Sequence, residues 1–211
     1  MRFVGLLCVL ALTSPAWSQA KKAHVGGPVN SEGVEVQVEL PPKFHLKNRG
    51  GSDGAGLCVF ASLKHASIWQ QVEQTVNIFE YMFTRPGGGW PEKVDKVIEI
   101  MCKEKGVPVP DYVQYQGRDV DFLMKALTTG RMVGVTYAYS PTGRYGGRKV
   151  AHMVNLVHAD GTWFAILDNN FPGTIEWMDR AAFLRAWTGG GGNGWAVVFL
   201  NPSPPPVPRA D

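Results

Sequence analysis

The spacing of hydrophobic residues predicts one strand and then several helices in the first part of the chain. Hydrophobic and polar residues alternate over residues 33–40, which is the pattern of a half-buried strand. A glycine-rich loop follows over residues 41–56, and a loop of that length inside a compact domain usually has a function. Apolar residues then recur at helical spacing, or cover most of a helix, and predict helices over residues 57–71, 76–84, 91–105 and 120–129.

The pattern changes from helical to strand spacing near residue 131. Runs rich in β-branched and aromatic residues, separated by Gly, Asp and Asn, predict strands over residues 132–139, 150–158, 162–168 and 195–200. Residues 158–161 suit a hairpin connection, and a short helix is expected over residues 180–187. Helices followed by a mostly antiparallel sheet predict one α+β domain over residues 33–201, in which an N-terminal helical half packs on the sheet.

The first twenty residues have the layout of a secretory signal peptide. Arg2 supplies a positive charge, residues 3–12 form an apolar run, and small residues at positions 18 and 20 suit cleavage after Ala20. The run is too short to span a bilayer, so no stable membrane anchor is expected. We therefore expect a secreted or periplasmic protein with a flexible lead-in over residues 21–32. A proline-rich, disordered tail is expected over residues 202–211.

Composition and charge narrow the classes of function. The 211 residues are 45% hydrophobic and 18% charged, as in an ordinary globular domain. The net charge is only +3 and no basic stretch is interleaved with aromatic residues, so nucleic acid is not an expected partner. No residues occur at the spacing of a zinc site, and neither a metal nor another cofactor is expected. The oligomeric state stays open.

Two cysteines remain after removal of the signal peptide, and one of them has the setting of a nucleophile. Cys58 begins a helix after the glycine-rich loop, whereas Cys102 lies in the middle of an amphipathic helix. The positive end of a helix lowers the pKa of a thiol, and the thiolate is the reactive form. The glycines also allow the Cys58 amide to face a developing oxyanion. Two alternatives are a Cys58–Cys102 disulfide and a thiol that is simply buried.

A histidine from the sheet is the expected partner of this thiol. His65 lies about 10 Å further along the same helix, which is too far for a hydrogen bond. His152 begins an apolar strand, where a rigid sheet can aim it at the helix. If residues 159–161 form the hairpin turn, His152 lies opposite about residue 168. Asp168 or Asn169 would then accept the ring N–H and orient the imidazole, although Asp and Asn are also common in turns.

With these residues in view, the chain resembles the papain-like cysteine peptidases, and most closely the bacterial double-glycine (bacteriocin-processing) peptidases. The resemblance rests on the order Cys, His, Asp/Asn and on four short patches. These are residues 54–61 (GAGLCVFA), 151–157 (AHMVNLV), 166–173 (ILDNNFPG) and 177–187 (WMDRAAFLRAW). It implies a nucleophile helix packed on a sheet and a triad of Cys58, His152 and Asp168, with Asn169 as the alternative third member.

One departure from the family concerns the oxyanion. The family places a glutamine about six residues before the cysteine as a second oxyanion donor, but position 52 of this chain is a serine. Ser52 and Asn48 are the candidates to replace it. Losing one such donor lowers a rate by about 10²–10³-fold.

The expected function is a cysteine peptidase or amide hydrolase that acts on a peptide or protein. Trp90 and Gly56 are candidate substrate-binding residues, although an aromatic residue such as Trp90 is more often part of a core. Two alternatives stay open. One is a peptide-binding module of the same fold with impaired catalysis, and the other is an acyltransferase or cell-wall endopeptidase that uses the same triad.

Overall fold

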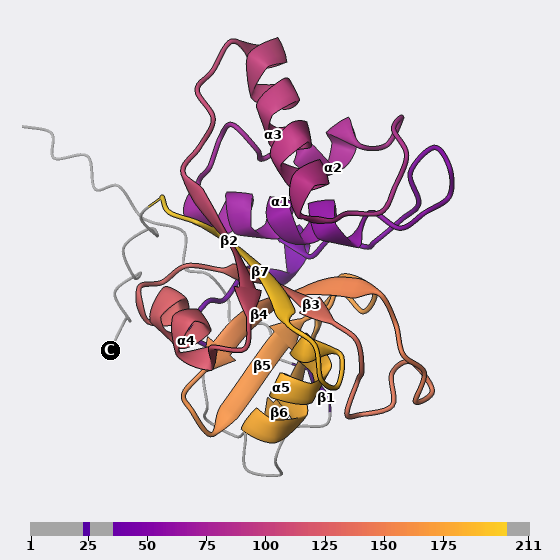
Figure 1. Ribbon diagram of the computed structural model, residues 1–211, viewed down its shortest axis with the longest axis vertical. Helices are drawn as coiled ribbons and strands as arrows, with labels where there is room; N and C mark the ends of the chain where they lie inside the picture. The colour runs from indigo at the N-terminus through magenta and orange to yellow at the C-terminus, as the bar shows by residue number, and fades with distance from the viewer. Residues whose placement is uncertain (1–22, 26–35, 202–211) are drawn as a thin grey trace, which may run out of the picture.

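The computed structural model describes residues 23–25 and 36–201 (Figure 1). The expected signal peptide and the proline-rich tail lie outside these residues, as does most of the expected lead-in. Within that lead-in, residues 23–25 form strand β1 (Ala23–Val25), which pairs in parallel with a strand near the end of the chain. Among the described residues, no helix has the length and hydrophobicity needed to cross a membrane.

The helices begin and end within one or two residues of the predicted bounds, except that the helix expected over residues 76–84 is shorter. They are α1 (Cys58–Gln70), the short α2 (Ile78–Tyr81), α3 (Pro91–Lys105), α4 (Val120–Thr128) and α5 (Arg180–Thr188), and a 3-10 turn, η1 (Pro42–Phe44), precedes them. Pro91 occupies the first turn of α3, and Gly106 ends it with a φ of 67°. The carboxylates of Asp119 and Asp179 cap α4 and α5 by accepting backbone N–H groups.

The remaining strands complete one seven-stranded sheet, which confirms the predicted α+β class. They are β2 (Tyr112–Gly117), β3 (Val133–Tyr137), β4 (His152–Ala159), β5 (Trp163–Leu167), β6 (Thr174–Asp179) and β7 (Gly194–Phe199). The order is β1-β6-β5-β4-β3-β7-β2, and every pair except β1–β6 is antiparallel. The sequence analysis found β3, β4, β5 and β7 but not β2 or β6.

The strand expected over residues 33–40 is wrong in its described part, because residues 36–40 form no strand. The alternation is real: Val36, Val38 and Leu40 are buried, and the two residues between them are exposed. The neighbouring strand β4 already pairs with β3 and β5, which leaves no free edge. A register shift in β4 near Val157 leaves the Val157 carbonyl able to accept a hydrogen bond from outside the sheet. The Val38 amide donates to this carbonyl at 3.0 Å. The segment therefore packs on the sheet without joining it.

Helix α1 is the central element of the molecule. In Figure 1 it lies between the sheet and the two helices α2 and α3. Most of its residues are buried, as expected from their hydrophobicity, and it packs against β3, β4 and β7. Polar contacts fix its position on β4: the Ser62 hydroxyl donates to the Met153 carbonyl at 3.1 Å, and the Asn155 amide donates to the Ser62 carbonyl at 2.9 Å. This packing brings the start of α1 to the start of β4.

Candidate active site

Cys58 is the first residue of α1 and lies under a clamped glycine-rich loop. Residues 50 and 56 form a backbone bridge, and the Asp53 carboxylate accepts the amides of Ala55 at 3.1 Å and Gly87 at 2.7 Å. The Gly88 amide donates to the carbonyl at position 56 at 2.8 Å. These contacts join the loop before α1 to the loop before α3. Cys58 is left 9% exposed at the end of a helix whose first N–H groups have no partner within the helix.

His152 begins β4 and contacts the thiol of Cys58. Burial raises the pKa of Cys58, but a hydrogen bond and charge interaction with His152 and backbone N–H groups of Met153 and Val59 outweigh it, so the pKa is lowered. Burial likewise lowers the pKa of His152, but Asp168 and Cys58 raise it to about 9. The two residues thus favour their charged forms together. The geometry supports a thiolate–imidazolium pair between α1 and β4.

Asp168 holds the other side of the imidazole. Its Oδ1 accepts from Nε2 of His152 at 2.8 Å and from the Asn170 amide at 2.8 Å, and its Oδ2 accepts from the Tyr145 hydroxyl at 2.7 Å. Burial of this carboxyl raises its pKa, but the hydrogen bonds and the charge of His152 outweigh burial and lower it. Because Nε2 binds Asp168, Nδ1 is the ring nitrogen that is available to Cys58.

The expected strand register is off by two residues, although the expected contact forms. Leu167 pairs with Asn155, whereas the hairpin argument places Leu167 opposite Met153. The difference arises at the turn, because Ala159 pairs with Phe164 and the hairpin is therefore centred between residues 161 and 162 instead of at residue 160. The irregularity in β4 then shifts the register by one residue in the opposite direction. The chain leaves β5 after Leu167 and turns, with the Phe171 amide donating to the Asp168 carbonyl at 2.9 Å. This turn carries Asp168 back to His152.

Asn169 points away from the imidazole and toward the nucleophile helix. Its side chain is fully buried, and Nδ2 lies 3.2 Å from the Cys58 carbonyl, 3.1 Å from the Ser62 hydroxyl and 2.9 Å from the Met153 carbonyl. It therefore fastens the first turn of α1 to β4. Of the two candidates for a third triad member, the geometry places Asp168 beside His152 and gives Asn169 a different set of partners.

The two candidate oxyanion donors differ in their distance from the nucleophile. Ser52 is exposed in the loop, and its backbone amide donates to the Arg85 carbonyl. Asn48 lies directly beside the residues that precede Cys58: its Oδ1 accepts from the Leu57 amide at 3.1 Å. Its Nδ2 lies 3.4 Å from the position that a Cβ at Gly56 would occupy, and it donates to Oδ1 of Asn170 at 3.1 Å. The structure thus brings Asn48 rather than Ser52 to the nucleophile turn.

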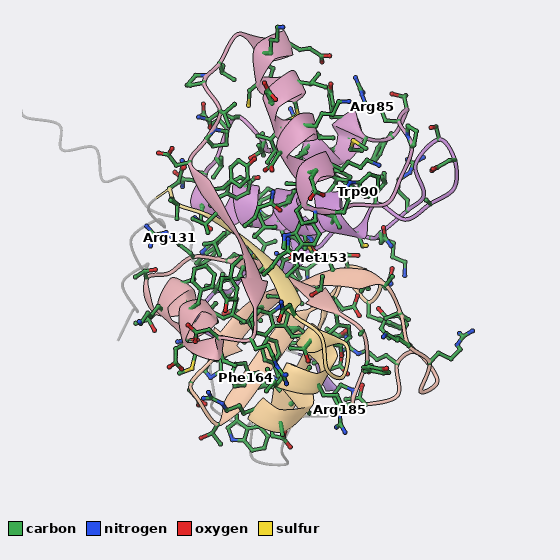
Figure 2. All side chains as sticks on the ribbon, in the orientation of Figure 1. Arg85, Trp90, Arg131, Met153, Phe164 and Arg185 are labelled. Carbon is green, nitrogen blue, oxygen red and sulfur yellow. The ribbon has the colours of Figure 1, made fainter. Side chains whose placement is uncertain are left out.

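The two candidate substrate-binding residues lie at the surface on this side of the molecule. Trp90 is 52% exposed and therefore is not a core residue, and the Lys93 ammonium lies 5.0 Å from its ring centre. Figure 2 places it at the end of α3 where the helical half meets the sheet. Gly56 is exposed and is tied to the loop before α3 through its carbonyl. Gly89 has no room for a side chain, since a Cβ there would lie 2.5 Å from Val59.

Two residues near the site were missed by the sequence analysis. Tyr145 comes from the loop between β3 and β4, and Asn170 follows the triad candidates on the turn after β5. Position just before the histidine strand is the only signal that could have pointed to Tyr145.

Cys58 and Cys102 are both free, so the disulfide alternative is wrong. A cavity of about 430 Å³ lies toward the opposite end of α1 and does not include Cys58. The residues that line it are Lys43, Phe44, Leu46, Lys64, Ser67, Ile68, Gln71, Val72, Glu73 and Val76.

Comparisons with known proteins add a distant structural likeness. No protein-family model matches the sequence, and no curated protein matches it. A crystal structure of a Bacillus anthracis protein described as a C39-like peptidase is 16% identical to this chain. The match covers 70% of this chain and 90% of that one, with a TM-score of 0.47. Similarity at this level does not by itself assign a family or a function to this chain.

Proposed function

We propose that this chain is a cysteine peptidase or related amide hydrolase of the papain-like type. The observation that carries the proposal is the arrangement of Cys58, His152 and Asp168. The thiol at the start of α1 hydrogen-bonds to the histidine at the start of β4, and Nε2 of that histidine lies 2.8 Å from a buried carboxylate. A nucleophile, a base and an orienting group in this order form the minimum set for acyl transfer through a thioester.

The geometry supports the following sequence of steps. The Cys58 thiolate attacks the substrate carbonyl carbon, and an S–C bond forms as the carbonyl oxygen takes the negative charge. Collapse of this intermediate breaks the C–N bond, and the His152 imidazolium gives its proton to the leaving amine. The neutral imidazole then takes a proton from water as the oxygen attacks the thioester. Release of the acid returns the thiolate. Asp168 stabilises the imidazolium, which is present before the first attack and again after the acid is released.

The developing oxyanion requires donors close to Cys58. The first donor in this proposal is the Cys58 backbone N–H, which belongs to the free N–H groups at the start of α1. The second is Nδ2 of Asn48, which is held next to residues 56 and 57. In the present arrangement this amide donates to Asn170 at 3.1 Å, so it has to exchange that acceptor for the substrate oxygen.

A peptide-binding module with impaired catalysis is the second candidate. The absence of a glutamine at position 52 and the engagement of the Asn48 amide with Asn170 favour it. An acyltransferase or cell-wall endopeptidase uses the same three residues and differs only in the acceptor or substrate. Turnover separates the binding module from the two kinds of enzyme: a screen of peptides and cell-wall fragments yields product with a hydrolase or transferase, and only binding with the module.

The first experiment measures thiol reactivity, which does not require a known substrate. Wild-type protein and the His152→Ala variant are treated with iodoacetamide at pH 6, and the modified cysteine is mapped by mass spectrometry. Without His152, the thiol loses the hydrogen bond and the charge interaction that come first among the groups lowering its pKa, while burial still raises it. A thiol with an ordinary pKa of about 8.5 is thiolate in only about 1 of 300 molecules at pH 6. We expect labelling of Cys58 to slow by about 100-fold or more.

The matched control is His158→Ala, which removes the other histidine of β4. His158 pairs with Asp160 near the opposite end of the strand, and we expect this variant to label like wild type. Equally slow labelling of wild type and His152→Ala would contradict the proposed pair and favour the binding module. Export is a separate part of the proposal, and N-terminal sequencing of the mature protein from a secreting host is expected to begin after Ala20.

A further inference from the structure

The loop between β3 and β4 brings a tyrosine hydroxyl to the carboxylate behind the histidine. Tyr145 donates to Oδ2 of Asp168 at 2.7 Å and accepts from Nδ2 of Asn170 at 3.1 Å. Its ring meets the His152 ring edge-on at 6.0 Å between centres, and the Phe171 ring at 5.5 Å. Tyr145 therefore touches the acceptor, the imidazole and the turn that carries the acceptor.

The two oxygens of Asp168 have unequal sets of donors. Oδ1 accepts from His152 and from the Asn170 amide, whereas Tyr145 is the donor that the described residues supply to Oδ2. The carboxylate is fully buried, so no water can replace a lost donor without a change in structure. A buried carboxylate keeps its charge only when hydrogen bonds and opposite charge offset the loss of solvation. The tyrosine hydroxyl is one of the donors that offset this loss, after the hydrogen bond and the charge of His152.

A second buried carboxylate, that of Glu176, holds the loop that carries Tyr145. Glu176 of β6 accepts from the hydroxyls of Tyr137 at 2.7 Å, Ser140 at 2.6 Å and Thr142 at 2.5 Å. Arg144, next to Tyr145 in the chain, lies 3.7 Å from the same carboxylate and donates to Thr174. The loop is thus attached to β6 at several points just before it reaches Asp168. This makes the tyrosine hydroxyl a held group rather than a freely rotating one.

We propose that Tyr145 is a positioning residue, whose hydroxyl keeps Asp168 ionised and turned so that Oδ1 faces Nε2 of His152. This inference rests on the proposed function, because it assigns a role in supporting the triad. Tyr145 acts through Asp168 and not on the substrate. A hydroxyl on the second oxygen leaves the first oxygen for the imidazole, and the two donors together fix the plane of the carboxylate relative to the ring.

The charges that face this group come from four parts of the fold. His152 of β4 and Cys58 of α1 lie on one side, and Tyr137 of β3 senses the charge of Asp168. Arg144 lies on the loop itself and favours the ionised form of Tyr145, but burial and the charge of Asp168 raise the pKa of Tyr145 and keep it protonated. A protonated hydroxyl next to an ionised carboxyl is the arrangement that the proposal requires.

The test replaces the hydroxyl alone and observes Asp168 directly. In Tyr145→Phe, the titration midpoint of the Asp168 carboxyl carbon, followed by NMR, is expected to rise by about one pH unit, because one donor to the charged form is lost. The matched control is Tyr139→Phe, which removes a hydroxyl from the same loop at a residue that contacts Lys149 instead. An unchanged midpoint in Tyr145→Phe, or an equal change in Tyr139→Phe, would overturn the inference.

A second readout links the tyrosine to the thiol. The acid limb of Cys58 alkylation is expected to move to higher pH in Tyr145→Phe, and this change is expected to disappear in an Asp168→Asn background. A lower rate with an unchanged pH profile, or equal effects in both backgrounds, would show a merely structural role. The failure of the proposed function is separable, since slow labelling of the wild-type thiol rejects that function while the carboxyl titration still tests Tyr145.

Discussion

Two adjacent residues, Asp168 and Asn169, are predicted to give opposite phenotypes when they are mutated. Asn169→Ala removes an amide that lies within 3.2 Å of three buried acceptors: the Cys58 carbonyl, the Ser62 hydroxyl and the Met153 carbonyl. Each buried group that loses its partner costs about 1–3 kcal/mol. The Ser62 hydroxyl and the Met153 carbonyl still bond to each other, so the Cys58 carbonyl is the acceptor that loses its side-chain donor, and the Oδ1 of Asn169 has no partner to lose. We therefore expect the free energy of unfolding to fall by about 1–3 kcal/mol.

Asp168→Asn changes the charge and keeps the shape. Burial lowers the pKa of His152, and among the groups that oppose burial Asp168 comes first, raising the value to about 9 together with Cys58. Loss of that charge moves the pKa of His152 down toward neutrality or below. The thiolate then loses its charged partner at neutral pH. We expect alkylation of Cys58 at pH 6 to slow by about tenfold or more, since each pH unit of change is a factor of ten.

Both phenotypes are measured on the same four proteins: wild type, each single variant and the double variant. Urea unfolding followed by fluorescence gives the stability, and iodoacetamide labelling across pH 4–9 gives the reactivity. The expected pattern is a stability loss in Asn169→Ala with the midpoints of the labelling profile kept, and a shifted profile in Asp168→Asn. The reverse pattern, with the labelling profile shifted by Asn169→Ala and kept by Asp168→Asn, would refute the assignment of the third triad residue.

Three further predictions concern other parts of the chain. His65 is fully buried, and burial lowers its pKa to about 4 despite a hydrogen bond to Asn155. Between pH 6.5 and 4 the unfolded state therefore binds a proton at His65 that the folded state does not bind. About 3 kcal/mol of the free energy of unfolding, fully present above pH 6.5, is lost as the pH falls from 6.5 to 4. Urea unfolding at several pH values measures this loss. An equally steep dependence of the unfolding free energy on pH in His65→Gln would contradict it. Gly89→Ala places a Cβ 2.5 Å from Val59 and is expected to lower the unfolding free energy by about 1–3 kcal/mol, unlike Gly192→Ala, whose nearest contact is 3.4 Å away. Cys102 is fully buried and burial raises its pKa, so we expect mass mapping to find it unlabelled in the native protein and labelled in urea.

Much of the fold and of the site follows from local sequence pattern. The helices obey apolar spacing and their capping residues, so their ends fall within one or two residues of the predicted ones except at α2. Cys58 and His152 were found because each has a local signature: a helix start after glycines, and a histidine at the start of an apolar strand. These signals depend on residues that are close together in the sequence, so a single sequence is enough to recognise them.

The features that were missed depend on distant parts of the chain. Strand β2 has no fully buried residue, and its strand character comes from pairing with β7, which lies about eighty residues away in the sequence. Strand β6 is similarly defined by its pairing with β5, and its central Glu176 is a poor strand residue that the loop hydroxyls stabilise. The bulge in β4 shifts the register without leaving a mark in the sequence. Tyr145 and Asn170 reach the site from a loop and a turn, whose paths no periodicity predicts.

The location of the charged residues explains why the site depends on the contact between α1 and β4. Cys58, His152 and Asp168 are all at most 9% exposed, and buried charges are costly unless each one is paired and hydrogen-bonded. The partners come from both elements: backbone N–H groups of α1 and β4 face the sulfur, and Tyr145 faces the carboxylate. Asn169 joins the same two elements by its side chain. A change that separates α1 from β4 therefore removes the support of the core and the partners of the thiolate in one step. Loss of reactivity without loss of stability is expected only from residues that, like Asp168 and Tyr145, touch the charges without joining the two elements.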